Sequence, residues 1–140
     1  MARFFGTYEH SLDSKGRVIL PSKFRAPFEH GGYLTEARDG CLAMWTPEEF
    51  ERQMEEMQEQ ASASRSNRNM ARFWASASRE LEIDRQGRMV LPARMREYAG
   101  LEGEVVVAGV IDRVELWNPQ RWREKVDPEE QRLTEGADED

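Results

Sequence analysis

Two short apolar runs, each directly behind a polar turn, give the first structural signal in the chain. Residues 17–20 read Arg-Val-Ile-Leu, and residues 88–91 read Arg-Met-Val-Leu. Because both runs are short, apolar and partly β-branched, they favour strands. Pro21 and Pro92 follow them, and proline lacks an amide proton and suits the first position of a helix. The pattern therefore predicts a strand and then a short helix at both places, the second helix running to Tyr98.

Four further apolar segments form two pairs that predict β-hairpins. The first pair is residues 33–36 and 41–45, with Arg-Asp-Gly between them. The second pair is residues 104–111 and 114–117, with Asp-Arg between them. Connections this short are typical of adjacent antiparallel strands. We therefore expect one hairpin in each half of the chain.

Helical patterns follow both hairpins. Residues 46–49 read Thr-Pro-Glu-Glu, which is a capping box with proline at the first helical position. Apolar side chains then recur at helical spacing as far as Ala61. Asn118 and Pro119 start the matching helix of the second half, and we expect Pro128 to limit it.

The segment between the halves changes character along its length. Residues 61–69 are rich in Ser, Asn and Ala and can fray, whereas residues 70–77 can form a helix that buries Phe73 and Trp74. Such apolar stripes pack either in the core of one chain or at a contact between chains, and the sequence leaves both open. Residues 131–140 are acidic and nearly free of apolar groups, which predicts disorder.

The two halves of the chain are copies of one unit. Residues 12–25 align with residues 83–96 at an offset of 71, and six of the fourteen positions are identical. After a slip of one residue, Trp-Thr-Pro at 45–47 matches Trp-Asn-Pro at 117–119, so the similarity spans a unit rather than a motif. The identical pairs are Asp13/Asp84, Gly16/Gly87, Arg17/Arg88, Leu20/Leu91, Pro21/Pro92 and Arg25/Arg96.

This duplication predicts the domain organisation. A length of 140 residues suffices for one compact domain or two intimate half-domains, and leaves no room for a third module. We expect a first half-domain over residues 1–60, a linker helix over 61–78, a second half-domain over 79–126 and an acidic, disordered tail over 127–140.

The distribution of charge matters more than its sum. The formal net charge of -7 argues against a nucleic-acid partner, because phosphate binding relies on Lys and Arg. However, residues 1–25 hold five basic and two acidic residues, and residues 79–96 hold five basic and three acidic. The acidic residues concentrate in 46–60 and 124–140. Both copies of the repeated motif are thus locally basic, which permits DNA binding.

The few Cys and His residues show no grouping that would support catalysis or metal binding. Cys41 is the single cysteine, so it cannot form an internal disulfide, and it has no useful spacing from His10 or His30. No N-terminal apolar stretch resembles a secretion signal or a membrane span. We therefore expect a cytoplasmic protein that is not an enzyme, with no metal, cofactor, small-molecule substrate or membrane partner.

The repeated motif combines turn chemistry with an arginine that the turn does not require. Asp at its first position and Gly at its fourth are typical of a type I turn. Arg17 and Arg88 follow the glycines. Each can form an exposed ion pair with the aspartate four residues earlier, worth about 0 to 1 kcal/mol. Alternatively, each can bind a phosphate or a guanine edge while that aspartate holds the guanidinium in place. The residues alone leave both interpretations open.

The run Leu-Asp-Ser-Lys-Gly-Arg at 12–17, its second copy at 83–88 and Glu-Leu-Trp at 115–117 resemble the MraZ family. The resemblance runs from about Phe4 to Trp122. It implies a mainly β fold with helices, in which two tandem half-domains form a pseudo-twofold swapped-hairpin β-barrel of the AbrB/SpoVT type. It also implies a ring-shaped homo-oligomer with cytoplasmic, nucleoid-associated control of transcription. The typical activity is repression of a cell-division and cell-wall gene cluster through repeated operator elements in double-stranded DNA.

The resemblance places the DNA-binding candidates in the motif. Arg17 is the first candidate for DNA contact and Lys15 supports it, whereas Arg88 and Arg85 serve in the second copy. Because the second copy has its basic residue one position earlier, the two copies are expected to contact DNA differently. Arg3 can add a phosphate contact. The positioning residues of the motif are Asp13, Gly16, Asp84 and Gly87.

The main alternative is a protein-interaction module of the same superfamily, such as an antitoxin whose disordered tail binds a partner. The acidic tail supports this alternative. The similarity between the two units favours the regulator, because a single-unit antitoxin would carry one copy of the motif.

Overall fold

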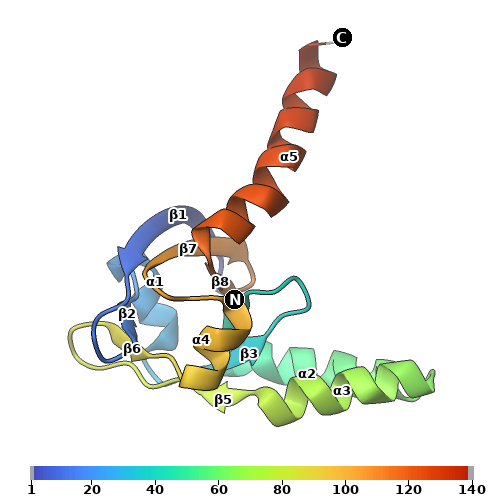
Figure 1. Cartoon of the computed structure of the whole chain (residues 1–140). Coiled ribbons are helices and arrows are strands. Elements are labelled where there is room, and N and C mark those ends of the chain that lie inside the picture. Colours follow the sequence, from blue (N-terminus) through green and yellow to red (C-terminus); the bar gives the residue numbers. More distant parts are fainter. Residues whose placement is uncertain (1, 139–140) are drawn as a thin grey trace.

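The computed structural model describes residues 2–138, in which helices and strands alternate along both halves of the chain (Figure 1). The strands of the first half are β1 (Phe4–Ser11), β2 (Arg17–Ile19), β3 (Tyr33–Glu36) and β4 (Leu42–Trp45). The strands of the second half are β5 (Arg79–Glu80), β6 (Arg88–Val90), β7 (Glu104–Ile111) and β8 (Val114–Trp117). The helices are α1 (Ser22–Arg25), the 3-10 helix η1 (Ala26–Phe28), α2 (Pro47–Ala61), α3 (Arg65–Ala77), α4 (Ala93–Ala99) and α5 (Pro119–Asp138).

The main sheet is symmetric about its centre. Across residues 2–138, its six antiparallel strands have the order β1-β7-β8-β4-β3-β5. The equivalent strands β4 and β8 pair at the centre, where Ala43 lies opposite Glu115. The hairpin of each half is flanked by the first strand of the other half, because β1 pairs with β7 and β5 pairs with β3. The duplicated halves therefore build one sheet together.

A two-stranded sheet, here called the ribbon, joins the halves at the repeated motif. β2 and β6 pair antiparallel, and the partners are Arg17 and Val90, Val18 and Met89, and Ile19 and Arg88. Beyond the strands, the Leu20 amide donates to the carbonyl of Gly87 at 2.8 Å, and the Leu91 amide donates to the carbonyl of Gly16 at 3.1 Å. Each copy of the motif is thus bonded to the opposite copy.

The main core draws apolar side chains from both halves. Ribbon residues Val18 and Met89 join it, together with strand residues of the main sheet. Because a chain of this size depends on one shared core, burial in either half requires the other. The largest fully buried side chains are Leu20, Leu34, Leu42, Met44, Met89, Leu91, Met95, Leu116, Val18, Val105, Val107 and Val114.

Helices α2 and α3 contribute a second, aromatic cluster beside β3 and β4. Tyr33 stacks on Phe50 with 4.1 Å between ring centroids, and Phe50 stacks on Trp74 at 5.2 Å. Trp45 Nε1 donates to Thr35 Oγ1 at 2.9 Å, so the buried indole nitrogen is satisfied. Figure 1 shows α2 and α3 side by side, as a helical hairpin that extends away from the sheet.

The predicted strands and helices largely occur, with small changes in their bounds. β2 ends at Ile19, one residue earlier than predicted. Pro21 and Pro92 occupy the N-cap positions of α1 and α4 rather than the first helical positions. The N-cap bond of the predicted capping box is present at the start of α2, since the Glu49 amide donates to Thr46 Oγ1 at 3.3 Å.

The main sheet is open and does not close into the barrel that the resemblance implies. β1 and β5 lie at its edges, and within the described residues each has one partner strand. β5 has only two residues, too few to pair along the eight-residue β1. The sequence pattern predicts neither edge strand, because Phe4 alone is fully buried in β1 and both residues of β5 are exposed. Within the described residues the strands thus form an open antiparallel sheet with helices, and the swapped-hairpin, double-split barrel of the resemblance stays a prediction.

Helix α3 starts five residues before the predicted helix. The Asn67 amide donates to Ser64 Oγ at 3.0 Å, which caps the helix within the segment expected to fray. Trp74 is buried as predicted, but Phe73 is 39% exposed, because only Trp74 faces the aromatic cluster. α3 lies inside the predicted linker of residues 61–78, and the proposed domain boundaries remain a prediction.

Helix α5 occupies the segment for which the sequence predicts disorder. It continues past Pro128 to its last residue, so this proline does not limit the helix. A proline inside a helix removes one backbone hydrogen bond and costs about 3 kcal/mol. The other turns of the helix can offset this cost. Glu129 and Arg132 form an ion pair one turn apart. The predicted disordered tail is therefore helical over residues 127–138, and residues 139 and 140 lie outside the described part.

We expect Gly109→Ala to destabilise the protein, because β7 lies against the β1 backbone at this position. A Cβ atom on Gly109 would lie 2.4 Å from the Phe5 amide nitrogen, so one backbone would have to move. Overpacking of this kind costs about 1 to 3 kcal/mol. Gly103→Ala is the matched control, because a Cβ atom there meets nothing within 4 Å. Denaturant unfolding measures both variants, and equal stability would contradict this account of Gly109.

Candidate nucleic-acid interface

In the first copy of the motif, Asp13 organises both the backbone turn and the arginine. Its Oδ1 accepts hydrogen bonds from the backbone amides of Lys15 and Arg17, each at 2.9 Å. Its Oδ2 accepts from Arg17 Nε at 2.7 Å. The Gly16 amide closes the turn by donating a hydrogen bond to the Asp13 carbonyl at 3.0 Å. Gly16 has a φ of 72°, which lies in the left-handed region that favours glycine. One carboxylate therefore fixes the turn and the guanidinium together.

The second copy repeats this geometry around Asp84. Its Oδ1 accepts from the amides of Gln86 at 2.9 Å and Arg88 at 3.0 Å, and its Oδ2 accepts from Arg88 Nε at 2.6 Å. Gly87 has a φ of 80°. The ion pair that the sequence left as one interpretation is thus present in both copies. Because the middle residues of the two turns differ, the shared geometry depends on Asp, Gly and Arg.

The hydrogen bonds lower the pKa of Asp13 and Asp84 below the ordinary value of 3.8. The largest cause is the backbone amide of Arg17 for Asp13, and that of Arg88 for Asp84. The side-chain bond from the same arginine lowers the pKa further, whereas desolvation opposes both effects. Both aspartates therefore stay ionised at neutral pH and keep accepting the bonds that define the turns.

The ribbon presents both arginines on one outward face. Val18 and Met89 point inward and are buried, so the alternate positions of each strand face outward. Each of the two outer cross-strand pairs combines one arginine with one exposed aliphatic side chain. The outward residues are Arg17, Ile19, Arg88 and Val90.

The aspartates engage only one nitrogen of each guanidinium. Among residues 2–138, no hydrogen bond engages the terminal nitrogens of Arg17 or Arg88. The two side chains are 22% and 35% exposed, respectively. Each arginine therefore keeps free donors in a fixed plane, which can bind a phosphate or a base edge without breaking the ion pair.

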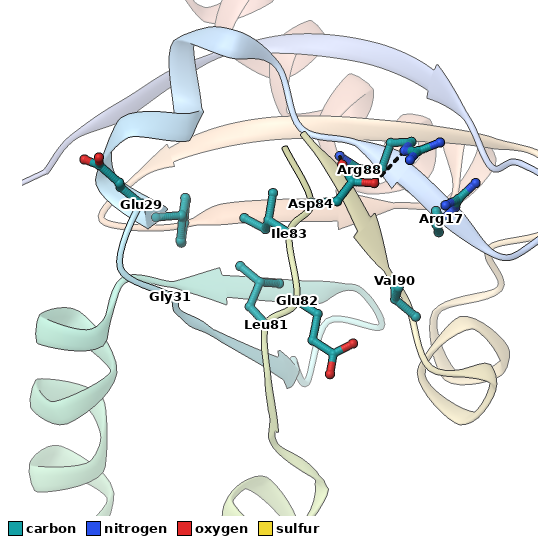
Figure 2. Close-up of a pocket in the computed structure, with 10 residues that line it drawn as sticks. Arg17, Glu29, Gly31, Leu81, Glu82, Ile83, Asp84, Arg88 and Val90 are labelled. Atoms are coloured by element: carbon teal, nitrogen blue, oxygen red, sulfur yellow. Dashed lines mark hydrogen bonds and ion pairs between the residues drawn. The ribbon is translucent and has the colours of Figure 1, made fainter. Parts of the chain in front are cut away.

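A depression of about 510 Å³ adjoins the ribbon near the second copy. Figure 2 shows Arg17 and Arg88 at its edge, and the dashed line marks the ion pair between Arg88 and Asp84. Glu29 and Glu82 also line it. Arg17, Arg88 and Val90 of the outward ribbon face also line this depression, so the two surfaces are continuous. Because three carboxylates offset two arginines inside it, the depression itself does not suit a small anion.

The other sequence candidates lie at different places. Lys15 and Arg85 are exposed in the two turns, so they extend the basic surface at the two ends of the ribbon. Arg3 is exposed but precedes β1, at the opposite end of that strand from the first turn. The structure thus groups the basic residues of the motif and separates Arg3 from them.

Two further arginines, to which the sequence patterns assign no function, lie against the turns. Arg25 Nε donates to the Leu20 carbonyl at 2.8 Å, and Arg96 Nε donates to the Leu91 carbonyl at 2.9 Å. The guanidinium of each then lies beside the turn glycine of the opposite copy. The available signal was the identity of these two positions in the repeat alignment.

Other chemistry finds little support in the described part of the chain. Cys41 is completely buried, and burial raises the pKa of its thiol, which disfavours a reactive thiolate. Over residues 2–138, no cluster of three or more His, Cys, Asp or Glu side chains could hold a metal ion. No helix in this range combines the length and apolar character needed to cross a membrane.

Comparison with known proteins agrees with the motif. A family model for the MraZ protein matches residues 3–73 and 75–140. The chain belongs to the MraZ family. A protein named transcriptional regulator MraZ from Nocardioides sp. is 42% identical over 121 residues, covering 86% of this chain and 84% of the relative. One of the same name from Pediococcus pentosaceus is 38% identical over 135 residues, covering 96% and 94%, respectively.

Membership of the MraZ family confirms the resemblance seen in the sequence. Each matched segment contains one complete copy of the motif, with its turn, its ribbon strand and the helix behind it. A further relative with the same name, from Acetivibrio thermocellus, is 40% identical over 119 residues, covering 85% of this chain and 83% of the relative. MraZ proteins are therefore a family of transcriptional regulators and not of enzymes.

We expect the pKa of Asp13 to stay below 3.8 in the Arg17→Ala variant, and the pKa of Asp84 to stay below 3.8 in the Arg88→Ala variant. The largest cause of each lowered pKa is a hydrogen bond from a backbone amide, and alanine retains that amide. Loss of the side-chain bond should raise each pKa only partly. The contribution of each ionised aspartate to stability is present above its unfolded-state pKa and is lost as pH falls through the lower folded-state pKa. Carboxyl NMR titration measures these values. A full return to 3.8 would assign the effect to the guanidinium instead.

Proposed function

We propose that this MraZ-family chain regulates transcription by binding double-stranded DNA through the outward face of the ribbon. One observation carries the proposal: two aspartate-held arginines with free terminal nitrogens lie on the same face of a pseudo-twofold ribbon. Arg17 and Lys15 provide the main contacts, and Arg88 and Arg85 provide the corresponding contacts in the second copy. The family and the names of its members support the regulation of transcription.

The shape and chemistry of the ribbon suit a DNA groove. A two-stranded β-ribbon fits the major groove, where an arginine can bind the O6 and N7 atoms of guanine with two hydrogen bonds. Ion pairing fixes each guanidinium before binding, so less side-chain entropy is lost in the complex. The exposed Ile19 and Val90 beside the arginines can contact thymine methyl groups.

The negative net charge of the chain is compatible with this surface. Six of its glutamates lie between Thr46 and Gln60, all of them on α2. Figure 1 shows α2 and α3 on the opposite side of the molecule from the turns of β2 and β6, so these carboxylates lie far from the ribbon. Exposed charges farther apart than the Debye length, about 8 Å at physiological salt, are largely screened from one another.

We also propose the finer features that the family resemblance implies. The halves exchange strands as the two chains of shorter swapped-hairpin relatives do, which the pairing of β1 with β7 and of β5 with β3 supports. The protein acts in the cytoplasm on the nucleoid, and represses its own cell-division and cell-wall gene cluster. The proposed units are half-domains over residues 1–60 and 79–126, joined by the linker over residues 61–78.

A ring-shaped homo-oligomer would present several ribbons to successive operator repeats. Linked sites raise the effective local concentration, so modest individual contacts can add up to useful affinity. Exposed apolar side chains support self-association: Phe5 is 74% exposed and Ile111 is 64% exposed, on the paired strands β1 and β7. Contiguous exposed apolar surface is typical of protein contacts.

We expect Arg17→Ala to weaken binding to DNA from upstream of the chain's own gene, and Arg88→Ala to do so less strongly. A lost two-bond contact to a base costs about 1 to 3 kcal/mol, which corresponds to roughly a fivefold to 150-fold change in affinity. Mobility shift at fixed salt measures each variant. Arg68→Ala, which removes the same charge from an exposed position on α3, is the control and should bind normally.

The same titration repeated over a range of salt tests the electrostatic basis. Affinity should fall with a logarithmic slope of about -0.9 for each phosphate neutralised. A flat salt response, or full binding by the Arg17→Ala/Arg88→Ala double variant, would refute the proposed surface. A stoichiometric protein partner that binds α5, without any DNA shift, would favour the antitoxin-like alternative.

Self-association is tested by sedimentation and native mass measurement of the full chain. We expect one closed assembly of several protomers. The double variant Phe5→Ser/Ile111→Ser should shift this assembly towards smaller species, because the two side chains supply exposed apolar area. Leu133→Ser, at another exposed apolar position on α5, is the comparison. A stable wild-type monomer at micromolar concentration would contradict the ring.

A further inference from the structure

Arg25 connects its own half of the chain to the turn of the opposite half. Its Nε donates to the Leu20 carbonyl at 2.8 Å, while the Leu20 amide donates to the Gly87 carbonyl at 2.8 Å. Its guanidinium covers that same glycine, since a Cβ atom on Gly87 would lie 2.4 Å from Arg25 Cζ. The chain of contacts therefore runs from α1 through the end of β2 to the turn that carries Arg88.

Arg96 makes the reciprocal set of contacts. Its Nε donates to the Leu91 carbonyl at 2.9 Å, and the Leu91 amide donates to the Gly16 carbonyl at 3.1 Å. A Cβ atom on Gly16 would lie 2.8 Å from Arg96 Cζ. Two equivalent arginines thus lie over two equivalent glycines, each in the opposite copy of the motif.

This crossed arrangement gives a second reason for glycine at both turns. Both glycines have positive φ, which already favours glycine, but they also lie directly beneath a planar guanidinium. A lysine ammonium could provide neither the flat contact with the glycine nor the fixed direction of the hydrogen bond that arginine Nε donates. Arg25 and Arg96 are both half-buried, so their positions are set by packing as well as by hydrogen bonding.

We propose that Arg25 and Arg96 are positioning residues that act crosswise: Arg25 holds the turn that presents Arg88, and Arg96 holds the turn that presents Arg17. The consequence for DNA rests on the proposed function, but the crossed coupling is a property of the free protein. The two turns are therefore not independent modules, because each is held by a side chain from the other half.

The coupling can be measured without DNA by amide NMR of the full chain. The reporter amides are those bonded to the two aspartates: Lys15 and Arg17 in the first turn, and Gln86 and Arg88 in the second. We expect Arg25→Lys to shift the reporters of the second turn and speed their hydrogen exchange, while those of the first turn change little. Arg96→Lys should give the opposite pattern. Each variant is thus the matched control for the other.

The outcomes separate this proposal from its competitors. If Arg25→Lys perturbs only the first turn, or perturbs both turns equally, the crosswise assignment is wrong. If it leaves all four reporters unchanged but weakens DNA binding, Arg25 contacts DNA directly and is not a positioning residue. Should either lysine variant fold poorly, the glutamine variant at the same position provides the same comparison.

A DNA titration then tests the functional consequence. Combining Arg25→Lys with Arg88→Ala should weaken binding little more than Arg88→Ala alone, because both act on the same contact, whereas Arg25→Lys with Arg17→Ala should show additive losses. We expect roughly a twofold to thirtyfold loss for Arg25→Lys alone. Additive losses in both combinations would overturn the crosswise role. Failure of wild-type DNA binding would refute the proposed function while leaving the NMR result intact.

Discussion

The antiparallel pairing of β2 with β6 is the constraint on which the proposed DNA surface depends. It places two short strands from opposite halves of the chain side by side, with Val18 and Met89 turned into the core. The inward packing of these two residues forces both arginines onto the other face, since side chains alternate along a strand. Hydrogen bonds beyond the strand ends attach each turn to the opposite half. The pairing of β2 with β6 therefore both packs the core and places the arginines on the surface.

The two halves share this geometry but differ around it. β1 pairs with β7 along eight residues, whereas its equivalent β5 pairs with β3 along only two. The chain beyond β5 consequently leaves a depression beside Asp84 and Arg88. Similar turns thus stand in unequal surroundings, and the middle residues of the turns also differ. The proposed DNA contact can therefore be asymmetric, although both turns share the features that hold their arginines.

The sequence predicts the ribbon strands, both hairpins and the helices behind them, because local patterns of apolar residues, proline and capping residues specify them. It does not predict β1, whose side chains are mostly exposed, since that strand is defined by backbone bonds to β7. The sequence offers the ion pair between Asp13 and Arg17 as one interpretation, but it does not show that the same carboxylate also accepts backbone amides. The contact of Arg25 with Gly87 depends on bringing opposite halves together, so no local pattern contains it. The helical course of α5 past Pro128 is likewise contrary to local signals.

The interleaved pairing also has a consequence for how the protein is made. Ser11, at the end of β1, bonds Glu104, a residue 93 positions later in the chain. At about 5 to 20 residues per second, the ribosome needs roughly 5 to 20 s to produce that partner. During this interval β1 and β2 lack the strands that pair with them, and their backbone groups bond to water instead. The nascent first half therefore passes through a stage of exposed strand edges, when molecular chaperones or a second nascent chain can reach it.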